Sequence, residues 1–248
     1  MDHQEHCAAL ETEIERFAEV YALTPPGLAV DSCPGWSVLD VAQHLGTVHR
    51  WSERLVSLLA PRRIAPDEMN LDLGPVSAGW LRHGGDRLLS TLRAGDPDAS
   101  MWAWGDDQHL RFWSRRQLHE TLVHRMDIEL ASGLSPDVDA AIASDALDEF
   151  LVNLPAAARF SPRVRDIRGD GGVLEVKASD VATRWTLRLL PKGFERLDGP
   201  VTSDAAISGT ALELLLVFYR RRPLATSNVA CEGDPDLIKF WLDHTVLE

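Results

Sequence analysis

The sequence predicts an α+β protein in which a helical bundle is followed by a smaller domain of mixed helices and strands. Through residues 1–155 the apolar side chains recur every three or four positions, which is the period of an amphipathic helix. From about Val173 the pattern changes to alternation with period two, which is typical of half-buried strands. A chain of 248 residues, 45% of them hydrophobic, is long enough for two modest cores. We therefore expect two domains, residues 1–155 and residues 156–248.

The helices of the first domain are predicted from this periodicity. In the first of them Leu10, Ile14 and Phe17 share one side, and the acidic Glu11 and Glu15 lie on the other. The same criterion applied along the chain gives helices over residues 3–21, 38–59, 76–92, 114–130 and 138–154.

Capping residues set the expected ends of two of these helices. Ser37 with Asp40 three residues on predicts the start of the second helix. Ser114 with Gln117 has the same spacing and predicts the start of the fourth. Gly133 suits the left-handed conformation that commonly follows a helix C-terminus.

The second domain is expected to contain a small sheet. A glycine-rich turn at residues 169–172 precedes the first alternating segment, which indicates antiparallel strands joined by turns. The expected strands cover residues 174–177, 183–189, 205–207 and 228–231, and the expected helices cover residues 210–219 and 235–243.

Charge and composition argue against several classes of protein. A net charge of -13 at pH 7 disfavours nucleic acid and anionic membranes as partners, because both attract basic surfaces. No apolar run approaches the ~20 residues of a membrane span, and the polar first residues are unlike a secretory signal. The cysteines, Cys7, Cys33 and Cys231, lie too far apart for a thiolate zinc motif or a disulfide framework. We expect a cytoplasmic monomer or homodimer whose partners are small molecules.

A candidate metal site centres on Glu120 and His124. At about 100° per residue, positions four apart on a helix lie roughly 40° apart, so both side chains share one face. His44, in the second expected helix, is the best third ligand. His119 is five residues from His124 and points elsewhere, which excludes the zinc-protease motif. From the residues alone two alternatives stay open, namely a solvated Glu–His pair and a hydrogen-bonded core histidine at position 44.

Four motifs in this sequence carry a resemblance to a known family. They are Ser32-Cys33-Pro34-Gly35-Trp36-Ser37, His44-Leu45, Glu120-x-x-x-His124 followed by Asp127 and Gly133, and the segment from Ala211 to Arg222 ahead of Glu232-Gly233-Asp234. In this order and spacing the chain resembles the actinobacterial mycothiol-dependent maleylpyruvate isomerases, a branch of the DinB-like metal-binding four-helix bundle superfamily. The resemblance implies a DinB-like up-and-down helical bundle followed by a small, sterol-carrier-like α+β domain.

The resemblance also implies a chemistry for the candidate site. In that family a divalent metal, usually zinc, is held by residues that correspond to His44, Glu120 and His124. Nickel or iron suits the same ligands. The resemblance names mycothiol as the cosubstrate of an isomerase or S-transferase, and implies that its metal-bound thiolate adds to the double bond of a maleylpyruvate-like electrophile. No catalytic residue beyond the metal ligands is predicted.

An anionic substrate in so acidic a protein calls for local positive charge. Arg222, Arg221 and Arg82 are the predicted residues for binding the cosubstrate or substrate, and the alternative is that they cap a helix or remain solvated. Two other functions stay open at this point. One is a non-catalytic DinB-like protein that binds a metal or ligand, and the other is a metal-dependent hydrolase with Asp127 as its base.

Overall fold

The computed structural model describes residues 1–71 and 73–245, which form two compact units, Met1–Asp137 and Val138–Glu248. The division lies earlier in the chain than the expected boundary at residue 155, because helix α5 (Ala140–Ala157) packs against α7 (Ala211–Phe218) of the second unit. The ring of Phe150 in α5 contacts that of Phe218 in α7. Residues 246–248 of the predicted second domain lie outside the described residues.

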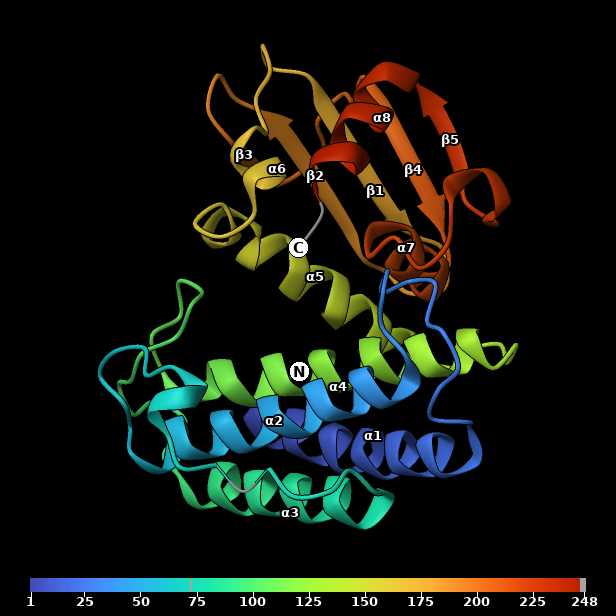
Figure 1. The fold of residues 1–248 in the computed structure, drawn as a ribbon. Helices are drawn as coiled ribbons and strands as arrows, with labels where there is room; N and C mark the ends of the chain where they lie inside the picture. The colour runs from blue at the N-terminus through green and yellow to red at the C-terminus, as the bar shows by residue number, and fades with distance from the viewer. Residues whose placement is uncertain (72, 246–248) are drawn as a thin grey trace. The chain divides into compact units, whose positions relative to one another are not determined.

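The first unit confirms the predicted helical bundle (Figure 1). Helices α1 and α2 each pack extensively against both α3 and α4, so neighbours in the bundle are not always neighbours in sequence. Among the described residues, no helix is long and apolar enough to cross a membrane. The elements of this unit are α1 (His3–Leu23), α2 (Val38–Ser57), the short η1 (Pro66–Glu68), α3 (Ala78–Ala94) and α4 (Leu110–Ala131).

Two of the three predicted helix ends are confirmed. The side chain of Ser37 accepts a hydrogen bond from the backbone N–H of Asp40, whose own carboxylate accepts from the backbone of Ser37. Gly133 adopts φ 74°, and the backbone N–H of Leu134 then donates to the carbonyl of Glu129 at 2.9 Å. This closes the C-terminus of α4 with a left-handed cap, as the glycine predicted.

The predicted start of α4 at Ser114 was wrong, because the helix begins at Leu110. Ser114 lies inside the helix, where its hydroxyl donates to the carbonyl of Arg111 and contacts Nδ1 of His3 at 2.9 Å. Leu110 and Trp113 are buried, so the apolar face of the helix extends a full turn upstream of the expected start. The Ser114–Gln117 spacing imitated a capping box inside a continuing helix.

The second unit confirms the predicted small domain of sheet and helices (Figure 1). Its strand order is β3-β2-β1-β4-β5, with β1 and β4 parallel and the other pairs antiparallel. Strand β3 was not predicted from sequence. Helix α8 packs on β4 and β5, and its Trp241 ring contacts Phe194 of β3. The remaining elements are α6 (Pro162–Arg165), β1 (Val173–Ala178), β2 (Arg184–Leu189), β3 (Phe194–Leu197), β4 (Ala205–Gly209), η2 (Leu224–Thr226), β5 (Ala230–Gly233) and α8 (Pro235–His244).

A buried charge network in the bundle generates the first testable prediction, on the free energy of unfolding. Arg125 is fully buried and donates to Glu13 and Glu129, each at 2.6 Å. Replacing Arg125 with alanine removes the buried cation from both carboxylates and leaves Glu13 only the half-exposed Arg16 at 3.7 Å, which we expect to cost about 3–5 kcal/mol in urea unfolding. Arg93→Ala is the control, because Arg93 pairs with Glu11 at the surface and its loss is expected to be much smaller. Equal losses in the two variants would contradict this account.

Candidate metal centre

Helices α2 and α4 bring the three predicted ligands together. The Nε2 atom of His44 lies 3.0 Å from Oε1 of Glu120, and Nε2 of His124 lies 3.4 Å from the same oxygen. One donor atom from each residue lies within 4.8 Å of the other two. The pair does not lie on a solvated helix face, because the side chains of His124 and Glu120 are only 11% and 22% exposed. Metal binding by these residues stays a prediction at this point.

A second contact between the two helices lies one turn further along α2. His49 is buried, and its Nε2 lies 2.9 Å from the hydroxyl oxygen of Thr121. Because that hydroxyl donates to the carbonyl of Gln117, the imidazole N–H is the donor to Thr121. Burial lowers the pKa of His49 to about 3, so the ring is neutral at neutral pH. This hydrogen bond ties α2 to the residue next to Glu120.

Asp127 holds His124 in one orientation. Its Oδ2 lies 2.9 Å from Nδ1 of His124, and its side chain is fully buried. The hydroxyl of Ser32 donates to the other carboxylate oxygen at 2.6 Å, and the thiol of Cys33 donates to Oδ2 at 3.4 Å. A carboxylate on Nδ1 fixes the tautomer in which Nε2 carries the lone pair that a metal requires. The predicted alternative of Asp127 as a base does not fit a carboxylate that is buried and engaged in this way.

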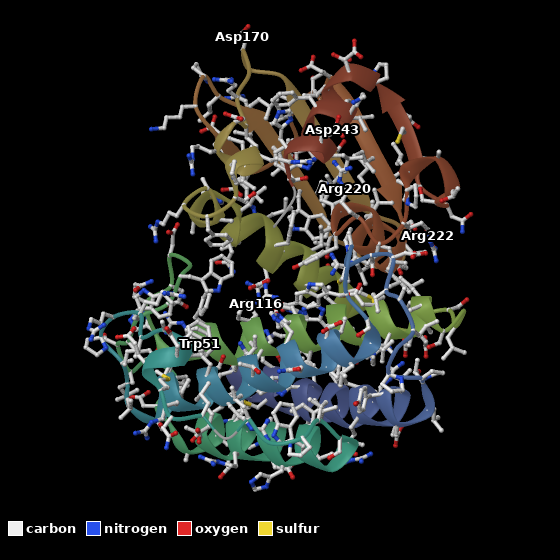
Figure 2. The ribbon with its side chains drawn as sticks, viewed as in Figure 1. Trp51, Arg116, Asp170, Arg220, Arg222 and Asp243 are labelled. Carbon is white, nitrogen blue, oxygen red and sulfur yellow. The ribbon has the colours of Figure 1, made fainter. Side chains whose placement is uncertain are left out.

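Arg116 and the two histidines keep Glu120 ionised. Burial raises the pKa of Glu120, but hydrogen bonds from His124 and His44 and the charge of Arg116 outweigh it and hold the pKa well below its usual value. Arg116 (labelled in Figure 2) donates from Nη2 to Oε2 of Glu120 at 3.0 Å. Oε1 is the oxygen that faces the two histidines. The carboxylate is therefore held in the charged form in which it serves as a ligand.

In the absence of a metal, a proton competes for His124. Burial lowers the pKa of His124, but hydrogen bonds with Asp127, Cys33 and Glu120 outweigh this effect and hold the pKa well above its usual value. A metal bound at Nε2 must displace that proton, as metal binding to histidine generally requires.

Trp36 forms an aromatic wall beside the two histidines. Its ring centroid lies 5.1 Å from that of His44 and 6.4 Å from that of His124, to which it is nearly parallel. The turn that carries Trp36 is anchored by the hydrogen bond from Ser32 to Asp127. From sequence, this turn was expected to lead into α2 and was one of the four motifs of the family resemblance. It also supplies one side of the site.

The other singled-out residues have partners of their own. His119 is fully buried, with its ring near that of His6, which fits its exclusion by spacing. Arg82 pairs with Glu15 of α1 at 2.7 Å. Arg221 and Arg222 belong to the second unit, where Arg221 donates to the carbonyl of Tyr219 and Arg222 pairs with Glu213.

Sequence reasoning missed the roles of three residues, and one of them was within its reach. Arg116 precedes Glu120 by four positions, so the spacing rule that paired Glu120 with His124 also places Arg116 on that face. The positions of Trp36 and Cys33 depend on how the turn folds back on α4, which spacing does not reveal.

A second group of possible metal ligands exists among the described residues, namely Cys33, His124 and Asp127. It shares His124 with the group of His44, Glu120 and His124.

Comparison with known families now adds to this geometry. The family model described as the mycothiol maleylpyruvate isomerase N-terminal domain matches residues 7–129, and the model of the C-terminal domain of the same family matches residues 137–239. The chain belongs to the mycothiol maleylpyruvate isomerase family. This is a family of isomerase enzymes, and the match confirms the resemblance drawn from the four sequence motifs.

Solved structures agree with this assignment at the level of the fold. Two crystal structures of mycothiol-dependent maleylpyruvate isomerase, one of them a histidine-to-alanine mutant, each cover 93% of this chain and 93% of their own. Their TM-scores are 0.57, with sequence identities of 14% for the mutant and 13% for the other. No curated protein sequence matches the chain. The likeness therefore supports the fold, and the chemistry has to be argued from the site.

The orientation of His124 by Asp127 generates a prediction about metal affinity. Asp127→Asn keeps the size of the side chain but removes the charge that holds the Nδ1 proton. We expect the affinity for zinc to fall by about 10–100-fold, measured by competition with a chromophoric chelator. Ser32→Ala is the matched control, since it removes one donor to Asp127 and leaves the Asp127–His124 contact in place. An unchanged affinity in Asp127→Asn would show that His124 does not need this partner.

Proposed function

We propose that this protein is a metal-dependent isomerase that uses mycothiol to convert a small, anionic, maleylpyruvate-like electrophile. The observation that carries the proposal is the convergence of His44, Glu120 and His124 from two helices. Asp127 contacts Nδ1 of His124, which leaves Nε2 as the nitrogen that can bind a metal. The family assignment supports the reaction type and the thiol.

The donor set fits a divalent metal. Two imidazole nitrogens and one carboxylate oxygen are a common ligand set of catalytic zinc sites, and they also suit nickel or iron. The fit rests on the placement of the donors: Glu120 directs one oxygen at both histidines and uses the other to accept from Arg116. With three protein ligands a metal keeps an open position, at which it would act as a Lewis acid and lower the pKa of an incoming thiol.

The cysteines of the chain support an external thiol. Cys7 is fully buried, and burial raises the pKa of its thiol to about 11. The thiol of Cys33 donates to Asp127 on the Nδ1 side of His124, away from Nε2. Cys231 belongs to the second unit. In the first unit neither cysteine presents its sulfur to the three ligands, so we expect the nucleophilic sulfur to come from a cosubstrate, which a reducing compartment such as the cytoplasm would keep as a thiol.

The proposed reaction is a reversible addition. The thiolate sulfur forms a bond to one carbon of the cis double bond, and the π electrons move to the adjacent carbonyl. The former double bond then rotates as a single bond. The electrons return, the carbon–sulfur bond breaks, and the trans product and the thiolate are released. The thiol is recovered unchanged, so no oxidant or reductant is consumed.

The chain's own residues have defined tasks in this proposal. His44, Glu120 and His124 form the binding set, Asp127 and Arg116 hold two of them in position, and Trp36 shields one side of the site from water. The three predicted cations already have partners: Arg82 pairs with Glu15, Arg222 pairs with Glu213, and Arg221 donates to the carbonyl of Tyr219. Asp127 is poorly placed to act as the base of a hydrolase, because it is buried and its carboxylate contacts Ser32 and His124.

The metal set is tested by metal analysis of purified protein. Wild type is expected to hold one divalent metal per chain, and His44→Ala or Glu120→Ala to lose at least about 90% of it, because two ligands hold zinc poorly. His83→Ala is the matched control, as His83 is an exposed histidine of α3 outside the candidate site. Wild-type protein that stays free of metal after loading with zinc, nickel and iron would overturn the proposal.

The thiol is tested separately, with metal-loaded protein and maleylpyruvate. Isomerisation is expected only when mycothiol is present, and is expected to fall by at least about 100-fold in Glu120→Ala. Equal turnover without any thiol would reject the addition mechanism while leaving the metal site intact. Hydrolysis of test esters without thiol would favour the hydrolase instead.

A further inference from the structure

A mostly apolar cavity lies within the second unit, among α7, η2, β5 and α8. Its volume is about 400 Å³, which is in the range of small-molecule binding sites. Val217, Ile238 and Leu242 are buried and form its apolar floor. The wall is completed by Pro223, Leu224 of η2, Cys231 of β5 and Pro235 of α8.

The rim of this cavity is positively charged in a protein whose net charge is -13. Among the described residues that line it, Arg220, Arg222 and Lys239 are cations, and Asp243 is an anion. Asp243 accepts from both Arg220 and Lys239, so one carboxylate is shared between two cations. Arg222 is paired with Glu213, which lies outside the lining. The rim therefore retains positive charge after its ion pairs are counted.

Arg220 closes the C-terminus of α7 with its backbone and contacts α8 with its side chain. Arg220 follows the C-terminus of α7 with φ 61°, a left-handed conformation in which glycine is the usual residue. The N–H of Arg221 donates to the carbonyl of Leu216 at 2.8 Å, which closes the same kind of cap as at Gly133. The side chain of Arg220 reaches the carbonyl of Leu242 and Asp243 on the rim (Figure 2). The backbone of Arg220 thus closes α7, and its side chain lies at the edge of the cavity.

We infer that this cavity binds a small organic carboxylate with an apolar body, placed with the body on the Val217–Ile238–Leu242 floor and the carboxylate at Arg220 and Lys239. Apolar contact provides the affinity, and the cations select the charge of the head group. This binding goes beyond the proposed isomerase function and uses none of its metal ligands.

Cys231 provides a direct readout, because its exposed side chain lines the cavity. Four probes separate the two features of the ligand: octanoate has tail and charge, octanol only the tail, acetate only the charge, and octylamine the opposite charge. Octanoate at ten times its dissociation constant is expected to slow alkylation of Cys231 by N-ethylmaleimide about tenfold. The alkylation rate is measured by peptide mass spectrometry. Acetate and octylamine are expected to leave the rate unchanged, and octanol to protect more weakly. Alkylation of Cys33 in the same samples is the internal control.

Substitutions at Arg220 and Leu224 test the contacts with the carboxylate and with the apolar body of the ligand. Arg220→Gln retains a side chain in the strained position but removes the charge, and is expected to weaken octanoate about tenfold without affecting octanol. Leu224→Trp fills the cavity from its half-exposed wall and is expected to abolish protection by both. Arg184→Gln is the matched control, because Arg184 is an exposed residue at the start of β2 outside the cavity lining, and it is expected to behave as wild type.

Two results would overturn the inference: no protection of Cys231 by octanoate, or equal protection by octanoate and octylamine. Metal content is measured on the same preparations. Failure of the metal site leaves octanoate binding unaffected, and failure of octanoate binding leaves the metal site unaffected, so the two proposals are judged independently.

Discussion

The contact between α2 and α4 is the constraint on which the proposed chemistry depends. It places Nε2 of His44 3.0 Å from Oε1 of Glu120, and the adjacent His49–Thr121 hydrogen bond fixes the rotation and register of the two helices. A slide of one residue along either helix would turn a ligand by about 100° and separate the donors. The bundle therefore acts as a rigid support, and the site belongs to its helices rather than to its loops.

Helix α4 carries buried charges toward two different neighbours, and each set has its own partners. On one face Glu120, which is paired with Arg116 along α4, and His124 meet α2, and Asp127 meets the turn before α2. On another, Arg125 is matched by Glu13 of α1. Buried ions are costly unless they are paired, so the separation of these networks lets one serve stability while the other retains donor atoms for a ligand.

Much of this arrangement could be predicted from sequence, and each exception has a physical cause. Helical spacing was enough to join Glu120 and His124 and to exclude His119, and the motif order identified the family. The start of α4 was misplaced because a serine inside a helix can show capping-box spacing. The roles of Trp36 and Cys33 depend on contacts between segments distant in sequence, which periodicity does not encode. Strand β3 forms a local hairpin with β2, but its four residues have no alternating burial pattern from which a strand could be predicted. Arg221 and Arg222 were singled out by charge alone, and charge does not show which partner a side chain meets.

X-ray absorption spectroscopy of the zinc-loaded protein tests the central claim most directly, because the chain offers two overlapping donor sets. The set of His44, Glu120 and His124 contains nitrogen and oxygen only, whereas the set of Cys33, His124 and Asp127 contains sulfur. The account predicts a shell of nitrogen and oxygen at about 2.0–2.2 Å that is lost in His44→Ala. A sulfur scatterer at about 2.3 Å that survives in His44→Ala would contradict it and place the metal at Cys33.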